Sequence, residues 1–177
     1  MAVSDKKIAF LLTNGVEQVE LTSPRTALDE AGATTVIISP SENTLQAMEN
    51  DWDHGDTFTV DVPVAEANAD DYDALVLPGG TINADTLRTD EDAVALVKAF
   101  FAADKPVAAI CHAPWILAQA DLAKDRKLTS FESTKVDLEN AGADWSDSEV
   151  VVDGNLITSR NPGDLDAFNA AIADALK

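Results

Sequence analysis

Short apolar runs alternate along the chain with longer stretches in which apolar residues recur at helical spacing. Four runs are apolar or rich in β-branched residues, and they predict buried strands at residues 7–12, residues 35–39, Ala74–Leu77 and Val107–Ile110. Strands without a polar face indicate a parallel sheet that is covered on both sides. The pattern therefore predicts an α/β fold with helices on both faces of a mostly parallel sheet.

Helices are predicted between and after these strands from their start and stop signals. The first covers residues 20–31 and is stopped by Gly32. A second follows Thr89, which is predicted to be its N-cap ahead of an acidic first turn. Three more are predicted: a short helix opened by Pro114, one over residues 134–141, and a closing helix over residues 164–176 that Asn161 and Pro162 begin.

Weaker strand signals complete the pattern. Residues 150–152 and 156–158 flank the turn sequence Asp153-Gly154-Asn155, which predicts a hairpin. Residues 128–130 predict a short strand, and alternation over residues 57–62 predicts an exposed edge or hairpin strand. No repeat, low-complexity run or Pro/Gly/Ser-rich linker interrupts the pattern, so residues 1–177 are predicted to form a single domain.

The charge balance narrows the classes of partner. The chain has 12 Lys and Arg against 32 Asp and Glu, a formal net charge of −20. Such a charge argues against binding to nucleic acid phosphates or to an anionic membrane surface. It suits a salt-adapted, halophilic source; the alternative is an unusually acidic protein from an ordinary cell. Since no apolar run resembles a signal peptide or a membrane span, we expect the protein to be cytoplasmic.

One segment combines a strand end with two reactive side chains. The strand Val107–Ile110 runs into Cys111, and His112 follows directly. A nucleophile between a strand and a helix is exposed at the sheet edge in a tight turn. Amides and the dipole of the following helix favour a thiolate, so we expect a lowered thiol pKa. The alternative is a buried cysteine that merely packs, as free cysteines commonly do.

Other loops at the same sheet edge carry weaker signals. Glu17 and Glu20 follow the first strand and can reach Cys111 across the sheet, but acidic residues also open helices routinely. The pair Gly79-Gly80 can turn backbone amides toward an oxyanion, or can form a plain tight turn. Asp85 can orient the histidine, or can be an ordinary surface acid.

Metal and cofactor chemistry are not indicated. The chain has one cysteine and two histidines, without paired ligand spacing, so no metal site is expected. The second histidine, His54, is predicted to face solvent from a loop. No glycine-rich nucleotide motif occurs, so no cofactor is expected.

The segment Ala109-Ile110-Cys111-His112-Ala113-Pro114-Trp115 resembles the nucleophile elbow of the PfpI family, a group of intracellular cysteine peptidase-like and deglycase-like proteins. The resemblance runs from Ile8 to about Leu176. Its further matches lie at residues 15–21, 55–58, 73–80, 105–107, 128–130, 140–143, 151–155 and 159–160. It implies a single PfpI-like domain with a flavodoxin-like three-layer sandwich of the class I glutamine amidotransferase type.

The resemblance also implies roles for the candidate residues. Cys111 is the implied nucleophile and His112 its base, while Glu20 contacts the thiol and Glu17 is a nearby helper. Asp85 falls where the family often places an acid that completes the site of a neighbouring subunit. A homodimer, or a larger assembly of dimers, is therefore the implied functional unit.

The implied oxyanion and substrate-binding region includes Gly79, Gly80, Ala113 and Trp115, with Gly80 and the amide of His112 forming the oxyanion hole. Two residues depart from the family pattern. Ala113 replaces the usual glycine after the Cys-His pair, and its methyl group narrows the turn. Phe131 stands where some members have tyrosine, so a proton role for that hydroxyl is absent.

Several functions are compatible with this site. The first is a glyoxalase III- or deglycase-like stress-response hydrolase, in which a Cys111 thiolate attacks a small dicarbonyl or its early adducts. The second is an intracellular cysteine protease acting on peptides. The third is a non-enzymatic redox sensor or holdase in which the thiol is oxidised reversibly. A glutamine amidotransferase is excluded, because those enzymes use a histidine far downstream and none follows His112.

Overall fold

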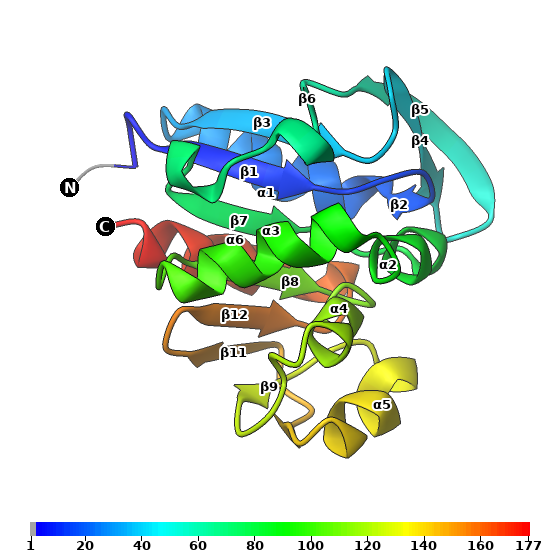
Figure 1. Cartoon of the computed structure of the whole chain (residues 1–177), viewed down its shortest axis with the longest axis vertical. Coiled ribbons are helices and arrows are strands. Elements are labelled where there is room, and N and C mark those ends of the chain that lie inside the picture. Colours follow the sequence, from blue (N-terminus) through cyan, green and yellow to red (C-terminus); the bar gives the residue numbers. More distant parts are fainter. Residues whose placement is uncertain (1–2) are drawn as a thin grey trace.

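The computed structural model describes residues 3–177, which are built around a seven-stranded sheet (Figure 1). The strands follow one another across the sheet as β11 (Val150–Asp153), β12 (Leu156–Ser159), β8 (Val107–Ile110), β7 (Ala74–Leu77), β1 (Lys7–Leu11), β3 (Thr34–Ser39) and β6 (Val62–Pro63). Neighbouring strands are parallel, except that β11 and β12 form an antiparallel hairpin. The mostly parallel sheet predicted from the apolar runs is confirmed.

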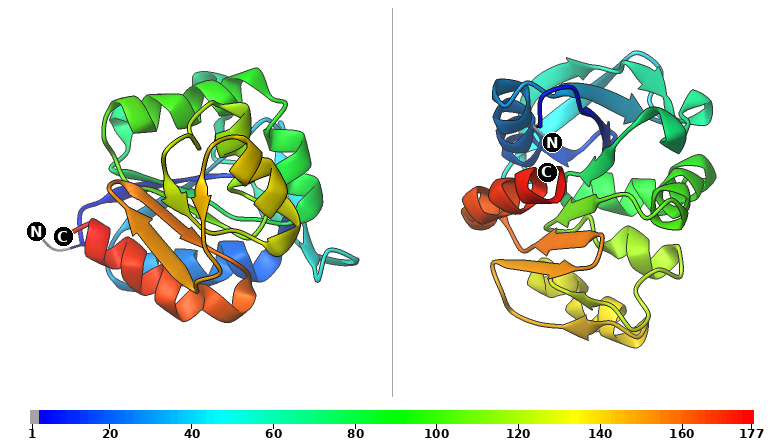
Figure 2. Two further views of the ribbon diagram at one scale, coloured as in Figure 1. Left: turned by 90° about the horizontal axis from the view of Figure 1, so that it is seen from below. Right: turned by 90° about the vertical axis from the view of Figure 1, so that its left-hand side faces the viewer.

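Helices cover both faces of this sheet. Figure 2 shows α1 (Gln18–Glu30) and α6 (Leu165–Ala175) together on one face and α3 (Glu91–Ala102) on the other. The alternation along β1 explains the two cores: Ile8 and Phe10 join one buried cluster, whereas Ala9 and Leu11 join the other. The three-layer α/β sandwich is therefore confirmed, and the carboxyl ends of β1, β7 and β8 meet at one edge.

Shorter elements surround the sheet. Three short helices are α2 (Thr81–Leu87), α4 (Trp115–Gln119) and α5 (Lys135–Asn140). Four single turns of 3₁₀-helix are η1 (Val64–Glu66), η2 (Ala69–Asp71), η3 (Glu132–Thr134) and η4 (Pro162–Asp164). Two small sheets are formed by β9 (Lys127–Leu128) with β10 (Asp144–Trp145), and by β2 (Val16–Glu17), β4 (Thr44–Glu49) and β5 (Asp53–Thr59).

Two local predictions were wrong. The N-cap of α3 is Asp90, whose carboxylate accepts a hydrogen bond from the Ala93 amide at 2.8 Å, while the Thr89 hydroxyl donates to the Thr86 carbonyl. His54 is exposed as expected, but it lies in a strand, because β5 begins at Asp53 and pairs with β4. The β4–β5 hairpin extends past the ends of the central strands, close to β2 and α2 (Figure 1).

Within residues 3–177, no helix is both long and apolar enough to cross a bilayer.

The excess of carboxylates predicts a salt-dependent stability. Exposed like charges repel one another in the folded state, and about 1 M salt shortens the screening distance to about 3 Å. We expect the melting temperature to rise by about 5 °C or more between low salt and about 1 M KCl, which corresponds to roughly 2 kcal/mol. A variant in which the exposed Glu30, Glu42 and Glu139 are changed to glutamine should gain less from KCl. An unchanged melting temperature in wild type would contradict salt adaptation.

Candidate active site

Cys111 occupies a sharp turn between β8 and α4. Its backbone has φ +63°, a left-handed conformation that is uncommon for any residue with a side chain. The turn is held on both sides: the Cys111 amide donates to the Ser159 carbonyl at 3.0 Å, and the Cys111 carbonyl accepts from the Phe131 amide at 2.8 Å. Backbone strain that is stabilised in this way is common at reactive sites. The strand–turn–helix arrangement expected around the cysteine is therefore present.

His112 lies directly against the thiol. Its Nδ1 is 3.1 Å from Cys111 Sγ, and its ring stacks on Phe131 with the centroids 4.5 Å apart. On the other side of the ring, Nε2 lies 3.1 Å from Ser133 Oγ and 3.4 Å from Thr81 Oγ1. Burial lowers the pKa of His112, so the resting imidazole is neutral near pH 7 and can accept the thiol proton.

Glu20 approaches the thiol from the first turn of α1. The residue is fully buried, its Oε2 accepts a hydrogen bond from the Gly79 amide at 2.8 Å, and its carboxyl contacts the Cys111 thiol. Burial raises the pKa of Glu20 to about 8, although the contacts with Cys111 and Gly79 oppose this increase. At neutral pH the carboxyl therefore carries a proton that it can donate.

The expected lowering of the thiol pKa is not found. Cys111 is 6% exposed, and burial together with the charge of an ionised Glu20 raises its pKa. The amides of Gly80 and His112 lower the pKa, as expected of oxyanion donors, but their effect is smaller. A proton on Glu20 removes the opposing negative charge, so the thiolate is less strongly disfavoured when Glu20 is neutral, although burial still raises the thiol pKa.

Gly79 and Gly80 form the wall opposite the cysteine. A Cβ on Gly79 would lie 2.7 Å from Cys111 Cβ and 2.8 Å from the Ile110 carbonyl oxygen, so no side chain fits there. Gly80 has φ +92°, a conformation that favours glycine and that allows its amide to face the sulfur. The pair therefore brings a backbone donor and Glu20 to the thiol in a space that only glycine permits.

Three other predicted site residues do not reach the thiol. Asp85 is exposed on α2, and its carboxylate makes no hydrogen bond or ion pair with another residue of 3–177. Trp115 points elsewhere, since its Nε1 donates to Asp137 at 2.9 Å and Arg88 stacks on its ring. Ala113 is buried in the core, and its amide donates to the Ile110 carbonyl, so it is not a free oxyanion donor.

Glu17 has a different position from the one expected. Its two carboxylate oxygens accept hydrogen bonds from the backbone amides of Asn50 and Asp51, at 2.9 and 3.1 Å. It therefore holds the turn of the β4–β5 hairpin.

The structure brings Asp51, Thr81 and Ser133 into the site, none of which the sequence singled out. Asp51 accepts hydrogen bonds from both the amide and the hydroxyl of Thr81.

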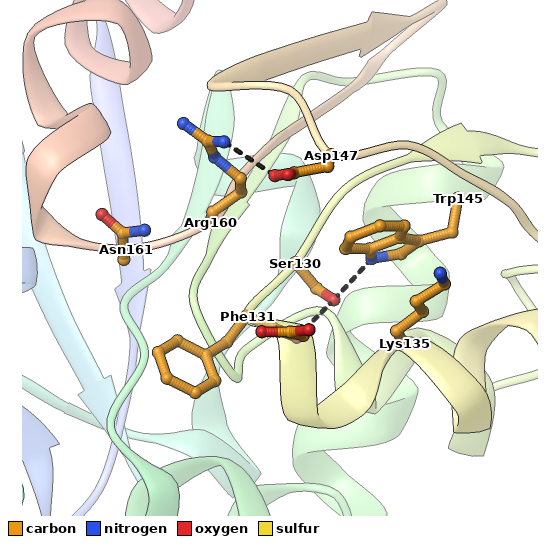
Figure 3. Close-up of a pocket in the computed structure, with 8 residues that line it drawn as sticks. Ser130, Phe131, Lys135, Trp145, Asp147, Arg160 and Asn161 are labelled. Carbon is orange, nitrogen blue, oxygen red and sulfur yellow. Dashed lines mark hydrogen bonds and ion pairs between the residues drawn. The ribbon is translucent and has the colours of Figure 1, made fainter.

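A cavity of about 360 Å³ lies near the histidine but is not lined by it. Phe131 lines it and also stacks on His112, so the cavity and the imidazole share this side chain. Figure 3 shows Trp145 and Lys135 on another part of the wall, and Trp145 Nε1 donates to Ser130 Oγ at 2.9 Å. Cys111 does not line the cavity either, so Phe131 is the side chain that links it to the reactive pair.

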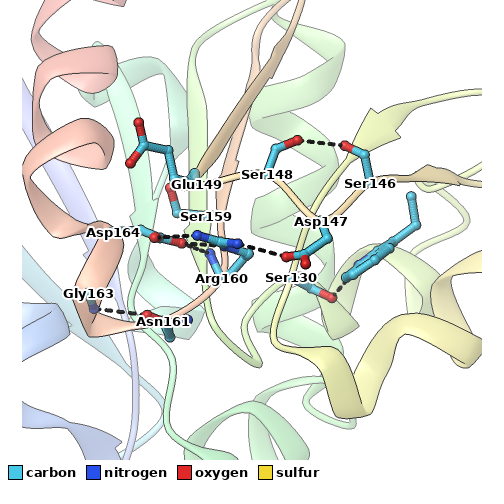
Figure 4. A network of polar contacts seen from close by, with 11 residues as sticks. Ser130, Ser146, Asp147, Ser148, Glu149, Ser159, Arg160, Asn161, Gly163 and Asp164 are labelled. Carbon is cyan, nitrogen blue, oxygen red and sulfur yellow. Dashed lines mark hydrogen bonds and ion pairs between the residues drawn. The ribbon is translucent and has the colours of Figure 1, made fainter.

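Arg160 closes one side of this cavity within a network of ion pairs (Figure 4). It donates to both oxygens of the buried Asp164 at 2.9 Å and to Asp147 at 2.7 Å. These contacts join the end of β12 to the loop that precedes β11.

Among residues 3–177, no group of three or more His, Cys, Asp or Glu is arranged to hold a metal ion.

The family model described as DJ-1/PfpI family matches residues 6–175. The putative cysteine protease YraA of Bacillus subtilis is 43% identical over 173 residues, which cover 97% of this chain and 99% of the relative. The Staphylococcus aureus protein SAV1875 is 45% identical over 174 residues, with coverage of 97% and 99%.

Two solved structures have the same fold. A two-domain Anabaena variabilis protein with DJ-1/ThiJ/PfpI-like and ferritin-like domains has a TM-score of 0.91 at 37% identity. The match covers 97% of this chain and 48% of that longer chain. DJ-1beta of Drosophila melanogaster has a TM-score of 0.87 at 30% identity, with coverage of 97% and 90%.

Proposed function

The chain belongs to the DJ-1/PfpI family, and from this premise we propose that it is a cytoplasmic cysteine-dependent enzyme acting on reactive dicarbonyls such as methylglyoxal, or on their early adducts. One observation carries the proposal: the Cys111 thiol lies between a neutral imidazole at 3.1 Å and a buried carboxyl that holds a proton at neutral pH. This arrangement supplies a nucleophile, a base and an acid without a cofactor.

The first step joins the sulfur to the aldehyde carbon. His112 Nδ1 takes the thiol proton as sulfur attacks, and the amides of Gly80 and His112 face the oxyanion that forms. Glu20 then donates its proton to that oxygen. The products are a hemithioacetal, an imidazolium and a Glu20 carboxylate.

The second step moves hydrogen between the two carbons. The Glu20 carboxylate removes the hydrogen from the sulfur-bearing carbon while His112 donates its proton to the neighbouring carbonyl oxygen, giving an enediol. Glu20 returns its proton to the second carbon, and His112 takes the hydroxyl proton from the first. The result is a thioester of lactate, with no net oxidation or reduction.

The last step is hydrolysis. The Glu20 carboxylate takes a proton from water, whose oxygen attacks the thioester carbon, and His112 returns its proton to the leaving sulfur. The site regains its starting protonation, and methylglyoxal plus water has become lactate. For an amine adduct the same thiol attack would begin the reaction.

Time-resolved NMR of the protein with methylglyoxal, with and without an amine, tests this proposal. We expect lactate from wild type and from the control His54→Gln, which alters the exposed histidine outside the site, but not from Cys111→Ala. Lactate formed only when an adduct is present would favour the deglycase branch. Equal product from wild type and Cys111→Ala would overturn catalysis by the thiol.

A second candidate function is peptide hydrolysis, which the name of the Bacillus subtilis relative, a putative cysteine protease, favours. Cys111 is 6% exposed, so only a flexible peptide end can reach its thiol. Release of a fluorophore from short peptides by wild type, but not by Cys111→Ala, would support this function. If neither substrate class turns over and the thiol oxidises reversibly, the redox-sensor alternative is favoured.

The proposal includes a homodimer in which Asp85 of the partner subunit approaches the site, since the chain's own Asp85 lies exposed on α2. Subunit exchange between Asp85→Asn and Cys111→Ala should then restore part of the activity, because one site in each mixed dimer retains both groups. Mixed dimers seen by mass spectrometry without any activity would remove Asp85 from the site.

A further inference from the structure

His112 Nε2 faces the Thr81 hydroxyl, whose hydrogen is already donated to another acceptor. Asp51 Oδ2 accepts from Thr81 Oγ1 and Asp51 Oδ1 accepts from the Thr81 amide, both at 2.9 Å. The Thr81 oxygen can therefore only accept from the ring, and His112 Nε2 lies 3.4 Å from it.

The direction of these bonds selects one tautomer. If Nε2 carries the ring hydrogen, Nδ1 is unprotonated, and Nδ1 is the atom 3.1 Å from Cys111 Sγ. Only this tautomer can take the proton from the thiol. Ser133 Oγ, 3.1 Å from Nε2, does not select a tautomer, because a hydroxyl can rotate to donate or to accept.

The turn that presents Asp51 is a tight hairpin turn bound by Glu17. Asn50 and Asp51 have φ +56° and +62°, as in a type I′ turn, and both their amides donate to Glu17. Asn and Asp adopt this left-handed conformation more readily than other residues with side chains. Glu17 therefore fixes the place of Asp51, although Glu17 itself does not reach the thiol.

We propose that Asp51, acting through the Thr81 hydroxyl, is a positioning residue that orients the His112 ring and keeps its proton on Nε2. The inference deepens the proposed function, since it takes Cys111 and His112 as the reacting pair. Asp51 acts within its own chain, whether or not a partner's Asp85 also approaches. Two titratable groups act on the ring directly: the Cys111 thiol at Nδ1, and the Asp51 carboxylate, whose charge opposes the lowering of the His112 pKa by burial; Glu20 contacts the thiol instead.

Asp51→Asn reverses the bond directions. The backbone amide of Thr81 needs an acceptor, so it should keep its hydrogen bond to the side-chain oxygen of the new asparagine. The NH₂ group of that asparagine then faces Thr81 Oγ1. The hydroxyl must accept from that group and donate to His112 Nε2, which moves the ring proton to Nδ1. The imidazole can then no longer accept the thiol proton. Thr81→Val removes the relay, whereas Thr81→Ser preserves it.

The test uses ¹⁵N-labelled protein and iodoacetamide, so that it does not depend on any substrate. The chain has two histidines and one cysteine, so His54→Gln assigns the ring signals and alkylation reports on Cys111 alone. We expect an Nε2–H signal in wild type and in Thr81→Ser, and an Nδ1–H signal in Asp51→Asn. Alkylation near pH 7 should slow by roughly 10- to 100-fold in Asp51→Asn and Thr81→Val, by less in Ser133→Ala, and not in Thr81→Ser.

An Nδ1–H signal in wild type, or an unchanged tautomer and alkylation rate in Asp51→Asn, would overturn the inference. An equal slowing in Ser133→Ala would do the same, because Ser133 would then be the orienting group. Thermal unfolding of each variant shows whether it is folded, and recovery in Thr81→Ser separates the hydroxyl from a packing effect. A tautomer change in a protein that turns over no dicarbonyl would support the inference while overturning the proposed function.

Discussion

Replacing Glu20 with glutamine is expected to lower methylglyoxal turnover by roughly 10²- to 10⁴-fold while leaving the site assembled. The amide oxygen can still accept from the Gly79 amide, and the NH₂ group can still donate to the sulfur. Glutamine cannot accept or release a proton, so hydrogen transfer between the two substrate carbons should stop. Lactate formation measures the effect. Unchanged turnover would assign the proton transfers to His112 or another group.

The same variant should be more stable than wild type at alkaline pH. Burial raises the pKa of Glu20 from 4.5 to about 8, so the folded state binds this proton more tightly than the unfolded state does. The stability associated with the proton is complete below the unfolded pKa and is lost as pH rises toward 8. Glutamine does not titrate, so the difference should grow across this range to at most about 5 kcal/mol.

Denaturant unfolding of both proteins at several pH values measures this difference. Glu30→Gln is the matched control, because Glu30 lies on the same helix but is exposed. It should change neither turnover nor the pH dependence of stability. A Glu20→Gln curve parallel to that of wild type from pH 5 to pH 9 would contradict a raised pKa. Lower activity with higher stability would show that the buried acid serves chemistry at the expense of the fold.

The sequence predicts the elements whose pattern is local. The apolar run at β8 followed by Cys111 and Pro114 predicts a strand, a turn and a short helix, and the structure contains all three. The hairpin of β11 and β12 follows from Asp153-Gly154-Asn155 in the same way. These predictions hold because apolar periodicity and turn residues act over a few neighbouring positions.

The positions that sequence misses depend on contacts between distant segments. Asp51 is one of 32 acidic residues, and nothing near it in the chain indicates that its hairpin turn meets Thr81. Glu17 resembles a helix-start acid until the fold brings Asn50 to it. The thiol pKa was expected to fall because helix amides are visible in sequence, whereas the burial that raises it is not.

Gly79→Ala is expected to disrupt both the fold and the site. A Cβ there would meet Cys111 Cβ at 2.7 Å, the Ile110 carbonyl oxygen at 2.8 Å, and Glu20 Oε2 at a still shorter distance. The backbone oxygen and the cysteine Cβ cannot move without shifting the elbow. The free energy of unfolding should fall by about 1–3 kcal/mol, the usual cost of overpacking. Turnover should fall as well, because the added methyl group separates Glu20 from the thiol.

Gly154→Ala is the control for Gly79→Ala. A Cβ on Gly154 has no atom within 4 Å, so its cost is limited to roughly 1–2 kcal/mol for the left-handed backbone at φ +58°, and activity should be retained. Combining Gly79→Ala with Glu20→Ala then isolates the contact with the carboxyl. If the methyl group clashes with Glu20, the double variant should lose less stability than the two single variants together. Strict additivity would place the clash on Cys111 and the Ile110 carbonyl alone, and in that case the loss of activity would come from a displaced elbow.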